Sequence, residues 1–92
     1  MGSNLYGEIR DDLKWIVDAL EDAELNYKAY NRGAQYNVTT EGGGTHSYYP
    51  TTGTVLLHSR RSKKTANIKG CTVFEFIDIV SNQDRINQLL NQ

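Results

Sequence analysis

Apolar residues recur at helical spacing over residues 5–24, near the start of the chain. One side of a helical wheel carries Leu5, Ile9, Leu13, Ile16, Val17 and Leu20. Acidic residues occupy the opposite side, and Ser3 or Asn4 can cap the first turn. The pattern predicts an amphipathic helix that buries its apolar side, with Trp15 at the border of that side.

Polar and apolar residues then alternate with the period of two that is typical of β-strands. We expect strands over residues 25–30, 34–40, 45–49 and 54–59. The segments between them are rich in turn residues: Asn31-Arg32-Gly33, Glu41-Gly42-Gly43-Gly44 and Pro50-Thr51-Thr52-Gly53. Pro50 fixes φ for a turn and Gly53 accepts a positive φ, so the last two strands are predicted to form a β-hairpin.

The C-terminal third is predicted to be a loop followed by helices. Residues 59–69 are polar and cationic and show no periodicity, which indicates a loop. Thr72 and Glu75 have the spacing of a capping box, and the apolar spacing that follows favours a helix over residues 73–80. The high β propensity of residues 73–80 leaves a strand as the alternative. A second start signal predicts a short helix over residues 84–90.

These elements define the fold class. The predicted order is one helix, three or four antiparallel strands and one or two C-terminal helices. The helices must bury their apolar faces, and one face of the sheet is the only partner of sufficient size. We therefore expect residues 1–92 to form a single small α+β domain, a two-layer sandwich.

Composition restricts the environment and the cofactors. The single cysteine, Cys71, cannot form an internal disulfide, which favours a reducing compartment. The N-terminus lacks the features of a signal peptide, and no apolar run reaches the roughly 18 residues that cross a bilayer. His46 and His58 have no third ligand at a recognised metal-binding spacing. We expect a cytoplasmic protein without a membrane partner, metal or small-molecule cofactor.

The net charge of −1 conceals an acidic first helix and a cationic segment near residue 60. The cationic segment comprises Arg60, Arg61, Lys63, Lys64 and Lys69, with His58 at its edge. A cationic loop that leads into a helix N-terminus favours phosphate, through its charges and through the free N–H groups of the helix. The alternative is a solvated loop that contributes only to surface charge.

Tyrosines on the predicted strands form a second candidate surface. Tyrosines that point away from the helices can stack on unpaired bases or contact a protein. The candidates are Tyr30, Tyr36, Tyr48 and Tyr49. Tyr48 and Tyr49 must point to opposite faces, so at most part of the set shares one surface. The alternative is cross-strand pairing that only stabilises the sheet.

Short motifs resemble known families. Ser62-Lys63-Lys64-Thr65-Ala66 is similar to the Ser-Lys-Lys-x-Ala with which the second helix of double-stranded-RNA-binding domains begins and contacts phosphates. Gly44-Thr45-His46 and Gly70-Cys71-Thr72-Val73 resemble motifs of HicA-type mRNA interferases, which have a related fold. Strand order places Gln35 at the catalytic position of that family, so we expect no ribonuclease activity; acid–base catalysis by His46 is the alternative.

A further resemblance concerns residues 48–53, Tyr-Tyr-Pro-Thr-Thr-Gly, which precede the Lys69-Gly70 start of the last helical region. This arrangement resembles small uncharacterised phage proteins, and it implies a protein that occludes a host partner.

The sequence thus predicts a non-enzymatic module that binds nucleic acid, RNA in preference to DNA, through residues 58–69. The alternative is an inhibitor or interaction protein that contacts a host protein through its acidic helix or its tyrosines. A homodimer also remains open.

Overall fold

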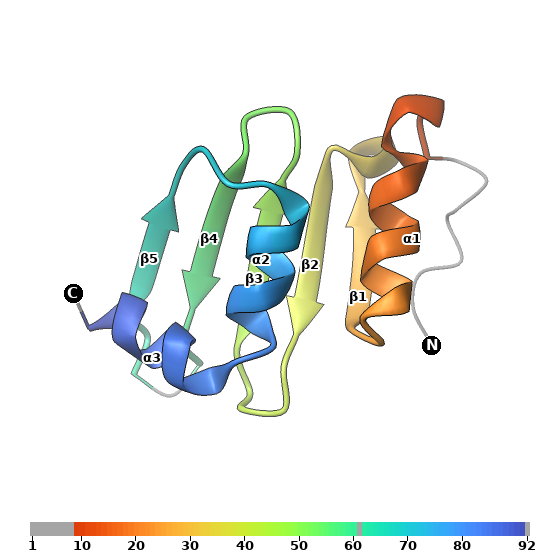
Figure 1. The fold of residues 1–92 in the computed structure, drawn as a ribbon. Coiled ribbons are helices and arrows are strands. Elements are labelled where there is room, and N and C mark those ends of the chain that lie inside the picture. The colour runs from red at the N-terminus through yellow and green to blue at the C-terminus, as the bar shows by residue number, and fades with distance from the viewer. Residues whose placement is uncertain (1–8, 61, 92) are drawn as a thin grey trace.

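The computed structural model describes residues 9–60 and 62–91, which form two layers (Figure 1). In this part of the chain one layer is a five-stranded antiparallel sheet and the other contains three α-helices. The strands are β1 (Asn26–Tyr30), β2 (Gln35–Thr39), β3 (Thr45–Tyr49), β4 (Thr54–His58) and β5 (Thr65–Ile68). The helices are α1 (Lys14–Asp22), α2 (Val73–Val80) and α3 (Gln83–Leu90). The predicted α+β class and element order are confirmed.

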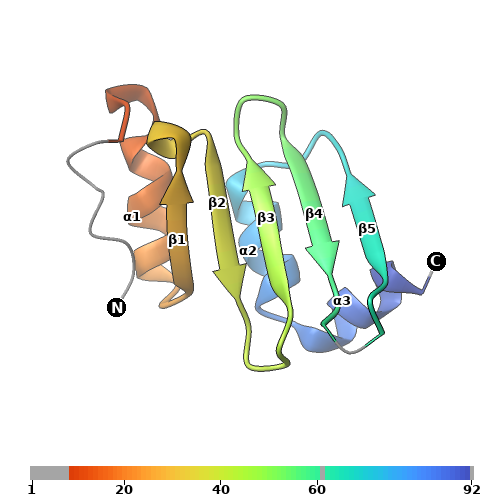
Figure 2. The same cartoon turned by 180° about the vertical axis from the view of Figure 1, so that it is seen from behind.

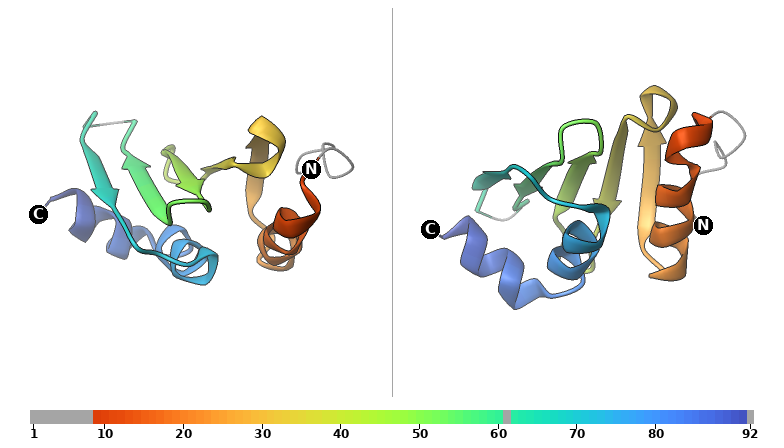
Figure 3. Two further views of the ribbon diagram at one scale, coloured as in Figure 1. Left: turned by 90° about the horizontal axis from the view of Figure 1, so that it is seen from above. Right: turned by 45° about the horizontal axis from the view of Figure 1, so that its top comes forward.

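The sheet is a meander in which each strand pairs with the next one along the chain. Short turns join the strands, and one of them contains the 3₁₀ turn η3 (Asn31–Gly33). The helices all lie on one side of the sheet, as the view from above shows (Figure 3). Seen from behind, the sheet stands in front of α1, α2 and α3, and none of these three helices covers this side (Figure 2). We call this uncovered side the open face.

Alternation along the strands places the core between the two layers. The side chains at the second and fourth positions of β1 to β4 are buried toward the helices. These strand residues are Tyr27, Ala29, Tyr36, Val38, His46, Tyr48, Val55 and Leu57. The helices bury Ile16, Val17 and Leu20 of α1, Val73, Phe76, Ile79 and Val80 of α2, and Ile86 and Leu90 of α3. Each helix therefore contributes one apolar face to the same core, as the sequence pattern predicts.

Residues 73–80 form a helix and not a strand, and the predicted capping box is present. The Thr72 hydroxyl accepts a hydrogen bond from the Glu75 N–H, and the Glu75 carboxylate accepts one from the Thr72 N–H. These contacts satisfy two N–H groups that a helix start leaves without partners. Phe76 then packs on the ring of Tyr48 at a centroid separation of 5.2 Å.

The prediction of a loop over residues 59–69 is wrong, because Thr65–Ile68 forms β5 at the edge of the sheet. Ala66 and Ile68 pack toward the core, while Thr65 and Asn67 lie on the open face. β5 has only four residues and lies between Lys64 and Lys69. Such a short strand does not produce a recognisable alternation of apolar and polar residues in the sequence. The cationic segment is consequently split between a β4–β5 turn, residues 59–64, and the segment after β5.

The first helix is also shorter than predicted. The 3₁₀ turn η2 (Asp11–Leu13) leads into α1, and Arg10 has the extended conformation, with ψ of 141°. The Arg10 N–H donates to the Arg32 carbonyl at 3.0 Å, so this part of the chain is tied to the β1–β2 turn. The predicted helical turns before Ile9 lie outside the described residues. Within the described residues, no helix has the length and apolar character needed to cross a membrane.

Candidate functional site

The two layers differ in charge. No residue of strands β1 to β5 carries a carboxylate. The carboxylates of the described residues lie instead on the helices, on the segments that flank them and, for Glu41, on the β2–β3 turn. Ion pairs join Arg10 to Asp12, Lys14 to Asp11 and Arg85 to Asp78, all in the helical layer. The acidic surface of residues 9–60 and 62–91 therefore belongs mainly to the helical layer, and the strands contribute no acidic side chain to the open face.

The open face presents mainly amides and hydroxyls, together with two tyrosines, one lysine, one leucine and one histidine. Its strand residues are Asn26, Lys28, Tyr30, Gln35, Asn37, Thr39, Thr45, Ser47, Tyr49, Thr54, Leu56, His58, Thr65 and Asn67. The side chain amides and hydroxyls can donate and accept hydrogen bonds at neutral pH without a charge. This composition is suited to a polar ligand that brings its own negative charge.

Tyr30 and Tyr49 are the two tyrosines of the predicted set that reach the open face. Tyr30 is 42% exposed and Tyr49 is half-buried. Tyr30 pairs with Gln35 and Tyr36 pairs with Tyr48, so the same register brings Tyr49 next to Gln35. Two strand spacings then separate Tyr30 from Tyr49, roughly 10 Å between Cα atoms. The two rings can therefore contact different parts of one extended ligand.

A hollow of about 350 Å³ lies on the open face below Tyr30 and is lined by Lys28, Asn37 and Thr45 among others. The Asn37 carboxamide oxygen accepts hydrogen bonds from the Ser47 hydroxyl at 2.8 Å and the Gln35 amide at 3.1 Å. These two hydrogen bonds fix the orientation of the Asn37 amide. Its N–H groups can then donate hydrogen bonds to a ligand. The hollow thus combines a cation, a fixed amide and an exposed aromatic ring.

The predicted cations do not form a single cluster before a helix. Arg60, Lys63 and Lys64 lie in the β4–β5 turn, next to His58 at the end of β4, whereas Lys69 follows β5. Lys64 and Lys69 flank β5, so roughly 16 Å of extended chain separates them. Only Lys69 is near the start of α2, and Lys64 donates to the Asn91 side chain on the helical side at 2.8 Å. Arg61 lies outside the described residues.

Tyr36 and Tyr48 are core residues, which corrects their assignment to an exposed surface. Their exposed fractions are 0% and 4%. Burial raises the pKa of Tyr36 to about 12, and it also raises the pKa of Tyr48, whose hydroxyl donates to the Cys71 carbonyl at 2.8 Å. Alternation puts Tyr36 on the same face as the apolar Val38, which was a signal for burial in the sequence, whereas the burial of Tyr48 follows from its pairing with Tyr36 in the structure.

His46 is also buried, with 1% of its surface exposed. Its Nδ1 accepts a hydrogen bond from the His58 N–H at 3.2 Å, and its Nε2 has no hydrogen-bond partner among the described residues. Burial, together with the nearby His58, lowers the pKa of His46 to about 4. The ring is therefore neutral at pH 7 and closed to substrates. The described residues contain no group of three or more His, Cys, Asp or Glu side chains suited to a metal ion.

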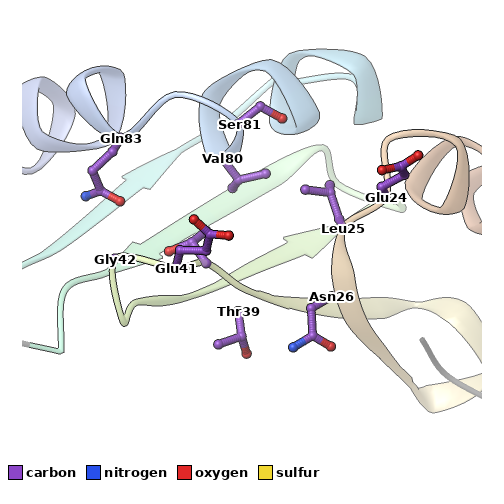
Figure 4. A pocket seen from close by; sticks show the side chains of 10 residues that line it. Glu24, Leu25, Asn26, Thr39, Glu41, Gly42, Val80, Ser81 and Gln83 are labelled. Atoms are coloured by element: carbon purple, nitrogen blue, oxygen red, sulfur yellow. The ribbon is translucent and has the colours of Figure 1, made fainter. Parts of the chain in front are cut away.

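A second cleft, of about 400 Å³, lies at the end of the sheet near the C-terminal ends of α1 and α2, and Asn26 and Thr39 line both this cleft and the hollow (Figure 4). Leu25 and Val80 supply apolar walls, and the carboxylates of Glu24 and Glu41 stand at its edges. The carbonyl ends of both helices add negative potential here. In contrast to the open face, this cleft favours cationic groups.

Sequence reasoning missed one exposed feature of the helical layer. Trp15 on α1 and Phe74 on α2 approach each other with ring centroids 6.0 Å apart, and both remain largely exposed. Their exposure could not be predicted from each helix alone, because it depends on how α1 and α2 pack on the sheet.

Comparisons of the chain with models of protein families, with curated proteins and with solved structures each find no match. The resemblances indicated by short motifs therefore stay predictions.

Burial of His46 predicts that the protein loses stability as the pH falls. The unfolded chain binds a proton at His46 near pH 6.5, but the folded protein does so only near pH 4. Stability is therefore complete above pH 6.5 and decreases as the pH falls toward 4. Between pH 7 and pH 5 the loss from this group is about 2 kcal/mol of unfolding free energy, which corresponds to a Tm lower by about 10 °C.

Thermal unfolding over this pH range checks the prediction. His46→Phe removes the titrating group and should flatten the profile between pH 7 and pH 5, whereas His58→Gln removes only the smaller cause of the shift and should retain most of the wild-type slope. An unchanged slope in His46→Phe would show that another group is responsible.

Proposed function

We propose that this protein is a non-enzymatic module that binds single-stranded nucleic acid, RNA in preference to DNA, on the open face of its sheet. The observation that carries the proposal is the composition of this face: two outward tyrosines and a lysine among mostly amide and hydroxyl side chains, with no carboxylate on any of the five strands. The strands therefore present no acidic side chain that would repel a polyanion such as nucleic acid. The proposal extends the predicted interface from residues 58–69 to the face that these residues border.

Stacking on the two tyrosines supplies the first part of the binding energy. A base stacked on an aromatic side chain contributes about 1–3 kcal/mol, and every base can stack. Because Tyr30 and Tyr49 lie two strands apart, separate bases of one strand can occupy them. Unpaired bases are required, since the bases of a duplex are already stacked on each other.

Cations at the borders of the open face supply the second part. Lys28 lies on β1, Arg60 and Lys63 lie in the β4–β5 turn, and Lys69 follows β5. Among the described residues none of these four side chains forms an ion pair, so each can contact phosphate. The cations occupy different borders of the sheet, which is the arrangement that a strand crossing the face requires.

Preference for RNA rests on the polar lining of the hollow. Asn37 and Thr45 can exchange hydrogen bonds with a ribose 2′-hydroxyl, which DNA lacks. Ser62–Ala66, the segment that resembles a phosphate-binding helix start, lies in the β4–β5 turn and the start of β5. It therefore contributes Lys63 to this interface in place of a helix N-terminus. A cytoplasmic location, where RNA and a reduced Cys71 coexist, is part of the proposal.

Replacement of the two outward tyrosines tests the stacking contribution. Tyr30→Ala and Tyr49→Ala should each weaken binding of a short labelled uridine oligonucleotide by about 10-fold, because each removes one stacking platform. Fluorescence anisotropy at low salt measures the affinity. Trp15→Ala, which removes an exposed aromatic ring from the helical layer, is the matched control and should bind like the wild type. Equal affinity in all three variants would disprove the proposed face.

Salt dependence tests the role of the border cations. Four phosphate contacts with a single strand predict that affinity falls about 50-fold between roughly 50 and 200 mM salt. The double variant Arg60→Gln, Lys63→Gln should reduce this slope by about half, because two contacts are lost. Arg10→Gln, Arg85→Gln removes the same charge from the helical layer and should leave the slope unchanged. If both double variants had the same slope, overall charge and not the β4–β5 turn would govern binding.

A further inference from the structure

The helical layer carries an exposed apolar seam between α1 and α2. Trp15 is 50% exposed and Phe74 is 63% exposed, although the two rings contact each other. One turn further along each helix, Ala19 and Ile77 are only partly buried and continue the seam. Figure 1 shows α1 and α2 side by side on the sheet, with their C-terminal ends pointing the same way.

The packing of α1 and α2 on the core does not depend on the side chains of Trp15 and Phe74. α1 is anchored through Ile16, Val17 and Leu20, which are essentially inaccessible, and α2 is anchored through Val73 and Phe76. The ring contact adds some attraction between the helices, but half or more of each side chain remains in water. Adjacent exposed tryptophan and phenylalanine side chains are typical of sites where a partner buries them.

Carboxylates border the seam on α1. Asp18 lies one turn from Trp15 and Asp22 lies two turns from it, whereas Asp78, one turn from Phe74, pairs with Arg85 of α3. The segment 11–24 contains six carboxylates and one lysine. The seam leads toward the cleft of Figure 4, where Glu24 and Glu41 stand beside the apolar walls and the helix C-termini add negative potential.

We infer that this seam docks a basic amphipathic helix from a partner protein. Apolar side chains of the partner cover Trp15 and Phe74, and its lysines or arginines meet the carboxylates along α1. A second copy in a symmetric dimer is a poorer occupant, because the acidic borders of the two copies would face each other. Nucleic acid is excluded from this surface by the same repulsion.

This surface is independent of the proposed nucleic-acid interface, because the two lie on opposite layers of the molecule (Figures 1 and 2). Both ligands can therefore be bound at once. The protein then connects a basic protein segment to a nucleic-acid strand.

Trp15 is the only tryptophan of the chain, so its fluorescence reports directly on the seam. The probe is a helical peptide of leucine and lysine with an amphipathic pattern, titrated at low salt. One control peptide replaces lysine with glutamate, and another keeps the lysines but replaces leucine with glycine. The leucine–lysine peptide should shift the Trp15 emission to shorter wavelength in a saturable manner, at least about 10-fold more tightly than either control.

Variants identify the side chains responsible. Phe74→Ala should weaken binding of the leucine–lysine peptide by about 10-fold, since it removes half of the aromatic pair. Tyr30→Ala, on the open face, is the matched control and should bind with wild-type affinity. A second variant, Asp18→Asn, Asp22→Asn, keeps the apolar seam but should reduce the salt dependence of binding. It serves as the test if thermal unfolding shows that Phe74→Ala is not folded.

Several outcomes would overturn the inference. Equal binding of the leucine–lysine and leucine–glutamate peptides would show unspecific apolar adhesion. Equal binding of the lysine–glycine peptide would show attraction by charge alone. A shift of the Trp15 emission with protein concentration, in the absence of peptide and together with a larger sedimentation coefficient, would assign the seam to a second copy of the chain.

Discussion

The structure depends on one-sided burial. In strands β1 to β4 the side chains that point toward the helices are buried. The side chains that point the other way are at least partly exposed, and most of them are polar. Each strand pairs antiparallel with the next through a short turn, so the inward positions of all strands face the same side. The helices can bury their apolar faces only there. The other side of the sheet is left uncovered by this arrangement and is available for binding.

One-sided burial also separates the charges. Carboxylates of the described residues belong to the helices and flanking segments, while the strands contribute none. Ion pairs then occupy cations of the helical layer, such as Arg10 and Arg85, and leave Lys28, Arg60 and Lys63 for ligands. A net charge of −1 therefore describes neither surface. Two surfaces of opposite character, separated by an apolar core, favour two different partners.

The sequence predicted those parts of the fold that follow from local periodicity. The strand alternation places Tyr30 outward and Tyr27 inward, and the capping box at Thr72 correctly marks the start of α2. β5 was not predicted because it has only two apolar residues, Ala66 and Ile68, which are too few to show a strand pattern in the sequence. Its alternation becomes meaningful only beside β4, where Leu57 pairs with Ala66.

The candidate sites were predicted less well, because each depends on how distant segments meet. The separation of Lys63 from Lys69 follows from β5, which the cationic composition of the segment concealed. Tyr36 and Tyr48 were grouped with outward tyrosines although their neighbours in the pairing register belong to the core. The exposure of Trp15 depends on where α2 packs on the sheet, and this position cannot be predicted from the sequence of α1.

The central claim is that the uncovered side of the sheet, and not the helical layer, receives nucleic acid. Amide chemical-shift mapping by NMR during titration with a short single-stranded RNA tests this claim most directly. If RNA binds the open face, the amides of β1 to β3 and of the β4–β5 turn should shift, while those of α1 and α2 should not. Shifts concentrated around Trp15 and Phe74, with an unchanged sheet, would contradict it.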